Sequence, residues 1–195
     1  MSRPQCPVCQ RPASHCLCAL IPSLESDTQV LILQHPSETA HALNTARLAA
    51  LGLRNAELLI GESFPAMADD GHTNYLLFPG PDALPLESLA DSTTPLRLVV
   101  PDGTWRKARK LLHVNPELAA LPRVSLPAGL VSRYRLRKAP EPGALSTLEA
   151  IVTALNILEG DGRFDALLRP FEALIEAQIQ AMGAEVYQRN HGDRQ

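Results

Sequence analysis

Short apolar runs alternate along the chain with polar, proline-rich segments, and this pattern predicts strands and helices in alternation. Apolar runs of about five residues bounded by Pro or Gly are typical of buried strands. Such runs predict strands over residues 29–33, 57–60, 75–78, 96–100 and 123–126. Apolar residues spaced by three and four predict helices over residues 37–51, 146–158 and 165–183. The alternation favours an α/β fold with a mainly parallel sheet and flanking helices.

Three signals within the predicted helices bear on their boundaries. Ser37 is a candidate N-cap of the first helix, and Gly52 is its expected stop. Pro170 lies inside the third helical pattern, so we expect that helix to be interrupted or restarted there.

The residues best suited to a functional site come directly after the strand predicted at residues 96–100. The strand is expected to stop at Pro101, and Asp102, Thr104 and the only tryptophan, Trp105, come within the next four residues. From Thr104 onward the apolar spacing becomes helical, so a carboxylate, a hydroxyl and an indole lie where a strand leads into a helix. Ligands of open parallel sheets bind at that edge. This segment is therefore the candidate site.

Composition limits the class of protein. The 195 residues are 45% hydrophobic and 20% charged, which fits a globular protein with one good-sized core. The chain shows neither an apolar run of the roughly 18 residues that a membrane span needs nor an apolar signal core. We therefore expect a cytoplasmic protein with no membrane association. The absence of a GxGxxG motif and of a phosphate-binding loop disfavours an ordinary Rossmann enzyme or a P-loop NTPase.

The net charge of −3 conceals a basic block. Residues 97–138 contain ten Lys and Arg but two acids, whereas the rest of the chain is strongly acidic. Such a block fits an anionic polymer such as a nucleic acid. A solvated helix face explains the charge equally well, so charge alone leaves both interpretations open.

A cluster of cysteines marks the start of the chain. All four cysteines of the sequence fall here, at Cys6, Cys9, Cys16 and Cys18. Four thiolates this close suit a tetrahedral zinc ion in a structural role, although iron, two disulfides or reduced thiols are alternatives. We predict a zinc-binding module with its connector over residues 1–26 and a catalytic domain over residues 27–195. The module is also expected to present Arg3 and Arg11 to a partner.

A second polar segment covers residues 132–149. Its Ser146 and Glu149 have the spacing of a capping box, which would satisfy free amides at a helix start. The alternative is that the same helix start lines a pocket for a small charged ligand.

Together these motifs resemble the DTW-domain family. Residues 102–105 resemble the motif that names the family, and residues 6–18 resemble its cysteine pattern. Further matching segments lie at residues 44–48, 108–122, 132–137 and 147–149, in the same order along nearly the whole chain. The resemblance implies a tRNA-uridine aminocarboxypropyltransferase. Such an enzyme moves the 3-amino-3-carboxypropyl group of S-adenosylmethionine to N3 of a tRNA uridine and releases methylthioadenosine. It also implies a SPOUT-like, knotted fold that holds the cofactor.

The resemblance also suggests roles for individual residues. Asp102 would accept the N3 proton of the uridine as the catalytic base, or would instead anchor the amino group of the cofactor. Trp105 would pack against the adenine or the sulfonium, and Arg137 would pair with the cofactor carboxylate. The remaining cofactor-binding residues would be Thr104, Ser132, Tyr134, Thr147 and Glu149. Phosphates of the tRNA would bind Arg106, Lys107, Arg109, Lys110 and Arg135.

Two other functions remain open at this stage. An RNA methyltransferase of similar fold would release S-adenosylhomocysteine instead of methylthioadenosine. A non-catalytic, zinc-dependent RNA-binding module would bind tRNA without saturable binding of S-adenosylmethionine. The sequence indicates no obligate protein partner in any of these cases.

Overall fold

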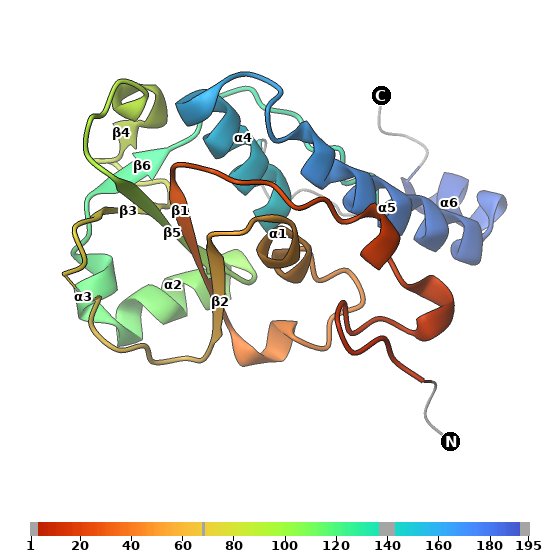
Figure 1. Ribbon diagram of the computed structural model, residues 1–195. Helices are drawn as coiled ribbons and strands as arrows, with labels where there is room; N and C mark the ends of the chain where they lie inside the picture. The colour runs from red at the N-terminus through yellow and green to blue at the C-terminus, as the bar shows by residue number, and fades with distance from the viewer. Residues whose placement is uncertain (1–3, 68, 137–142, 192–195) are drawn as a thin grey trace.

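A parallel sheet with helices on both faces forms the body of the protein, seen here in a computed structural model (Figure 1). The structure describes residues 4–67, 69–136 and 143–191. Within them, six parallel strands lie in the order β2-β1-β5-β3-β6-β4. Their bounds are β1 Gln29–Gln34, β2 Ala56–Ile60, β3 Thr73–Leu77, β4 Leu84–Pro85, β5 Leu96–Asp102 and β6 Arg123–Ser125. The predicted α/β class with a mainly parallel sheet is confirmed.

The helices divide between the two faces of the sheet. Their bounds are α1 Ala46–Gly52, α2 Trp105–Val114, α3 Pro116–Ala119, α4 Thr147–Glu159, α5 Leu168–Met182 and α6 Ala184–His191. Val30 and Ile32 of β1 pack in the larger core cluster with α1, α4 and α5. Leu31 and Leu33 point to the other face and pack with residues of α2 and α3. The strands are apolar on both sides because helices cover both faces.

The helix predicted over residues 37–51 is wrong in its first half. A short 3₁₀ turn, Pro36–Glu38, is followed by irregular chain, and the regular helix α1 begins only at Ala46. His35, not Ser37, caps the 3₁₀ turn by accepting a hydrogen bond from the Ser37 amide. The Asn44 side chain donates to the Glu38 carbonyl and pairs with Gln34, so polar contacts hold this segment over the end of β1.

Strand β5 continues past the proline where we expected it to end. Pro101 pairs with Leu33, and Asp102 pairs with Gln34, at the end of the β1–β5 ladder. The Asp102 carbonyl accepts a hydrogen bond from the His35 amide on the β1 side, so the Pro101 nitrogen faces β3. The β3 ladder has already ended at Val99, and a proline there costs no hydrogen bond.

The C-terminal helices also differ from the prediction. The helical pattern over residues 165–183 does restart, at Leu168 and not at Pro170 itself, and Pro170 is the third residue of α5, where an amide has no partner within the helix. A 3₁₀ turn, Asp165–Leu167, precedes α5, and α6, after Gly183, was not predicted.

The N-terminal cysteine segment is attached to the body of the protein. Leu17 is buried in the larger core cluster, and Ile21 and Leu24 pack against it. Arg11 turns inward, since its guanidinium donates to the carbonyls of Ala42 and Asn44. The expectation that Arg11 faces a partner is therefore wrong, and Arg3 lies outside the described residues. No helix among the described residues has the length and apolar character to cross a membrane.

Candidate active site and metal centre

The carboxylate of Asp102 lies at the carboxyl end of β5, in the middle of the sheet. Its side chain is buried, and the amide Nε2 of Gln34 on β1 donates to Oδ2 at 2.7 Å. The Thr147 hydroxyl, at the start of α4, donates to Oδ1. Two neutral donors from opposite sides thus fix the orientation of the carboxylate. Gln34 was not predicted, since a glutamine at the end of an apolar strand gives no local signal of this role.

A glycine turn carries the chain from Asp102 into α2. Gly103 has a φ of 156°, and a Cβ atom there would lie 3.1 Å from the Cβ of Lys107. The side chain of Thr104 caps α2 by accepting a hydrogen bond from the Lys107 amide. Trp105 is the first residue of the helix, and its half-buried ring contacts the edge of Phe78, with 5.4 Å between the centroids. The tight turn therefore places the indole directly beside the end of β5.

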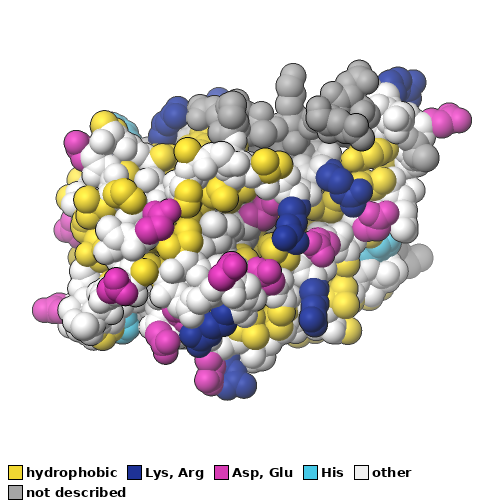
Figure 2. All heavy atoms as spheres, turned by 90° about the horizontal axis from the view of Figure 1, so that it is seen from above, with side chains coloured by type: hydrophobic (Ala, Val, Ile, Leu, Met, Phe, Trp, Pro, Cys, Tyr) yellow, Lys and Arg dark blue, Asp and Glu magenta, His cyan; other side chains and the backbone are white. Residues whose placement is uncertain are grey.

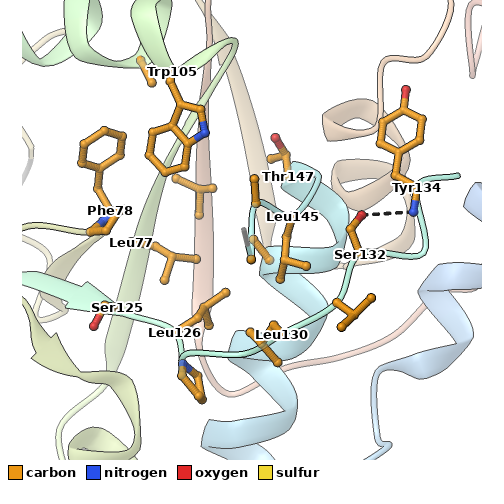
Figure 3. A pocket seen from close by; sticks show the side chains of 18 of the residues that line it. Leu77, Phe78, Trp105, Ser125, Leu126, Leu130, Ser132, Tyr134, Leu145 and Thr147 are labelled. Carbon is orange, nitrogen blue, oxygen red and sulfur yellow. Dashed lines mark hydrogen bonds between the residues drawn. The ribbon is translucent and has the colours of Figure 1, made fainter. Parts of the chain in front are cut away.

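A large cavity of about 1060 Å³ opens at the carboxyl ends of β3, β5 and β6. Figure 3 shows Trp105 and Phe78 on one side of it, with Leu130 and Leu145 on the other. Among the predicted cofactor-binding residues, it brings together Trp105, Ser132, Tyr134 and Thr147. A cavity of this size, mostly apolar with a few hydroxyls, suits a nucleoside-sized ligand.

A second, smaller cavity of about 280 Å³ adjoins the first. The two share Gly103, Tyr134 and Thr147 as lining residues. Asp102 lines the smaller cavity, as does the predicted cofactor-binding residue Thr104. The carboxylate therefore lies close to the boundary between a mostly apolar cavity and a smaller cavity whose lining is more polar.

Glu149 organises one wall of the large cavity without lining it. Its carboxylate accepts hydrogen bonds from the amides of Ser146 and Arg133, at 2.8 and 2.6 Å, and from the Ser132 hydroxyl. The capping box with Ser146 is confirmed. The same buried carboxylate therefore joins the start of α4 to the loop that carries Ser132 and Tyr134.

The predicted tRNA-binding cations are mostly paired with acids. Lys107 contacts Glu38 at 2.5 Å, and Lys110 contacts Glu62 at 2.9 Å. Arg135 lines the large cavity, and its guanidinium contacts Glu176 of α5 at 2.7 Å. The exposed side chains of Arg106 and Arg109, by contrast, have no ion-pair partner among the described residues. Figure 2 likewise shows acidic and basic side chains interspersed over one face.

Glu62 links the basic helix α2 to the end of β1. It accepts hydrogen bonds from Lys110 and pairs with the buried His35 ring at 2.8 Å. The ammonium of Lys110 and the neighbouring His35 lower the pKa of Glu62 below its usual value. Glu62 therefore stays ionised near neutral pH and offsets part of the positive charge of the helix.

Sequence reasoning did not find every residue of the cavity. Phe78 follows β3 and Tyr187 lies on the unpredicted helix α6, yet both line the large cavity. The residues around Phe78 gave no sign that its ring contacts Trp105. That contact arises because β3 lies next to β5 in the sheet. Arg137, the predicted partner of the cofactor carboxylate, lies outside the described residues.

The four cysteines form one compact group. Their sulfur atoms all lie within 4.8 Å of one another, with 3.6 Å between Cys6 and Cys18 and 3.8 Å between Cys9 and Cys16. Tetrahedral zinc bound by thiolates at about 2.3 Å requires sulfur separations of about 3.8 Å. The amides of Cys9 and Val8 lower the pKa of the Cys6 thiol to about 6, whereas contact with Cys16 raises that of Cys18 to about 12. The residues present therefore fit a four-sulfur zinc site.

The fold and the cavities define an α/β protein with a candidate ligand-binding site at the carboxyl edge of a parallel sheet. The comparison with known families identifies it more closely. The chain matches the DTW domain over residues 3–179 and belongs to that family.

Curated relatives support the same grouping. The chain is 34% identical over 190 residues to tRNA-uridine aminocarboxypropyltransferase 2 of Drosophila melanogaster, covering 91% of the chain and 76% of the relative. It is 34% identical over 200 residues to the protein of that name from Mus musculus, covering 94% of the chain and 66% of the relative. It is 30% identical over 198 residues to tRNA-uridine aminocarboxypropyltransferase A of Arabidopsis thaliana, covering 80% of the chain and 73% of the relative. No solved structure matches the chain.

Proposed function

We propose that the protein transfers the 3-amino-3-carboxypropyl group of S-adenosylmethionine to N3 of a uridine in tRNA. The observation that carries this proposal is the likeness, over most of the chain, to relatives named tRNA-uridine aminocarboxypropyltransferases. The site supports it independently, because a buried carboxylate lies near the boundary of two adjoining cavities of different polarity.

The two cavities suit the two reacting molecules. The large apolar cavity, with the indole of Trp105 in its wall, fits the adenosine and sulfonium of the cofactor. Ser132, Tyr134 and Thr147 would orient it, and Arg137 would pair with its carboxylate. The smaller cavity, lined by Asp102 and other polar residues, fits a uracil ring. A uridine held there would meet the reactive carbon across the shared wall.

Asp102 is the proposed general base. When bound, S-adenosylmethionine supplies a carbon whose bond to sulfur breaks as its bond to N3 forms, leaving neutral methylthioadenosine. Asp102 accepts the proton that N3 loses, so the positive charge of the sulfonium and the negative charge of the carboxylate disappear together. Gln34 and Thr147 hold the carboxylate oxygens in place while the proton moves.

The surface of α2 is the proposed contact for tRNA phosphates. Arg106 and Arg109 point into solvent without an acidic partner among the described residues, so they can meet a phosphate directly. Lys107, Lys110 and Arg135 would first have to give up their pairing with Glu38, Glu62 and Glu176. We therefore expect the two arginines to contribute most of the salt-dependent affinity.

The N-terminal segment is the proposed structural zinc module, residues 1–26, attached to a catalytic domain of residues 27–195. One support is the geometry of the four sulfur atoms. The other is that every described residue lining the two cavities lies at position 38 or later, outside the proposed module. Thiolate ligands persist in a reducing compartment, so we expect the protein to work in the cytoplasm.

We also propose that the catalytic domain is SPOUT-like and knotted near its cofactor. The support is the family resemblance and the long connection between β6 and α4, whose described parts line the large cavity. An experimental structure in which this connection passes outside the neighbouring loops would refute the knot.

The decisive experiment is an assay of the purified protein with S-adenosylmethionine and unmodified tRNA. Mass analysis of tRNA nucleosides should reveal aminocarboxypropyluridine, and the released by-product should be methylthioadenosine. Release of S-adenosylhomocysteine would instead indicate a methyltransferase. Binding of tRNA with no saturable binding of S-adenosylmethionine would indicate a non-catalytic RNA-binding protein.

A further inference from the structure

One arginine of the cysteine module reaches the active-site region of the same chain. Arg11 lies between Cys9 and Cys16 in the sequence, and its two terminal nitrogens donate to the carbonyls of Ala42, at 2.8 Å, and Asn44, at 3.4 Å. Burial lowers the pKa of the Arg11 guanidinium, while its interactions with Cys9 and Tyr134 oppose that shift. The guanidinium thus clamps a turn that follows β1 and belongs to neither a helix nor a strand.

The clamped turn leads directly to the catalytic carboxylate. The Asn44 side chain forms a reciprocal pair with the Gln34 amide, with Gln34 Nε2 donating to Asn44 Oδ1 at 3.1 Å and Asn44 Nδ2 donating back at 3.4 Å. The same Gln34 nitrogen donates its other hydrogen to Asp102. Gln34 is completely buried, so its amide cannot turn to water if this pairing is lost.

The segment around Asn44 depends on such contacts for its shape. It was predicted as helix but is irregular between the 3₁₀ turn Pro36–Glu38 and α1. Leu43 donates its amide to the His41 ring, and Asn44 donates its side chain to the Glu38 carbonyl. The segment's backbone hydrogen bonds, from His41 to the Glu38 carbonyl and from Asn44 to the His41 carbonyl, close isolated turns and form no continuous helix, so an external clamp influences where the Asn44 side chain lies.

We propose that Arg11 is a positioning residue for the transfer reaction, acting through Asn44 and Gln34 to fix the orientation of the Asp102 carboxylate. The cysteine module then sets the geometry of a site whose cavities its described residues do not line. This proposal rests on the function proposed above for Asp102. It assigns the module a catalytic consequence in addition to its structural one.

The test compares Arg11→Gln and Arg11→Lys with Arg54→Gln, an exposed arginine that pairs with Glu25 at the surface. Arg11→Gln should lower kcat about tenfold or more, because small displacements of a reacting group carry large rate effects, while KM for tRNA stays within twofold. Arg11→Lys should recover part of the loss, and Arg54→Gln should match the wild type. The bound metal per chain should be the same in all four proteins.

Two further measurements separate positioning from general stability. Hydrogen exchange at residues 42–44 should accelerate in Arg11→Gln, while exchange in α5 stays unchanged. The double variant of Arg11→Gln with Asn44→Ala should be no slower than Asn44→Ala alone, since both interrupt the same connection.

Several results would overturn the proposal. Wild-type kcat in Arg11→Gln, additive effects in the double variant, or unchanged exchange at residues 42–44 would each do so. A loss of kcat that follows a loss of bound metal would limit Arg11 to holding the module together. A wild-type protein that forms no aminocarboxypropyluridine would contradict the proposed function instead, and the exchange measurement would still test the clamp.

Discussion

Replacing Glu149 by glutamine tests whether a buried carboxylate holds in place the loop that carries Ser132 and Tyr134. The carboxylate accepts from two backbone amides, those of Ser146 and Arg133, and from the Ser132 hydroxyl. Glutamine keeps the shape but offers one oxygen, so one of the two amides must face an NH₂ group. Losing one charge-assisted hydrogen bond and leaving a buried donor unsatisfied costs about 2 kcal/mol.

Urea unfolding and calorimetric titration with S-adenosylmethionine measure the two expected effects. The free energy of unfolding of Glu149→Gln should be about 2 kcal/mol lower than that of the wild type. The variant should also bind the cofactor up to about thirtyfold more weakly, because up to the same free energy must then be spent on ordering the loop when the cofactor binds. The matched control is Glu172→Gln, which removes the exposed partner of Arg133 and should cost less than about 1 kcal/mol. Equal stability and equal affinity in the two variants would refute the role of Glu149.

Four further outcomes follow from the site. Asp102→Asn should slow transfer at least about a hundredfold while the affinity for S-adenosylmethionine stays within threefold, and a loss of that affinity would assign Asp102 to the cofactor amino group instead. Trp105→Ala should weaken cofactor binding by about 0.5–2 kcal/mol, and cofactor should change the fluorescence of this single tryptophan; a silent titration would place the cofactor elsewhere. Reversing the charge of both Arg106 and Arg109 should reduce the slope of log affinity for tRNA against log salt by about 2, and an unchanged slope would exclude this surface. Cys9→Ser should release the metal and lower the melting temperature, whereas full metal content in the variant would argue against a four-sulfur site.

Local signals predicted those parts of the fold that depend on neighbouring residues. The capping box of Ser146 and Glu149 formed as expected, because both partners lie within one helical turn. The apolar run ending near Asp102 formed the central strand β5, since a buried position suits a segment in which four of the five residues 96–100 are apolar.

Contacts between distant segments could not be predicted in this way. The pairing of Gln34 with Asp102 depends on the register of β1 against β5, which no local pattern encodes. The break in the helix expected over residues 37–51 has the same origin, because Asn44 bonds to Gln34 across a turn. Tyr187 of α6 lines the large cavity although it lies far along the chain from the other lining residues.

The wall shared by the two cavities has a practical consequence for inhibitor design. Gly103, Tyr134 and Thr147 line both spaces, so no thick partition separates the proposed cofactor and uridine positions. A single compound in which an adenosine and a uracil are joined by a short chain could therefore fill both. Joining the two halves makes binding of the second intramolecular, which raises affinity strongly when the linker length matches the span. In a series of such compounds whose linkers differ by one methylene each, the linker length of the tightest inhibitor would give the distance between the two bound groups.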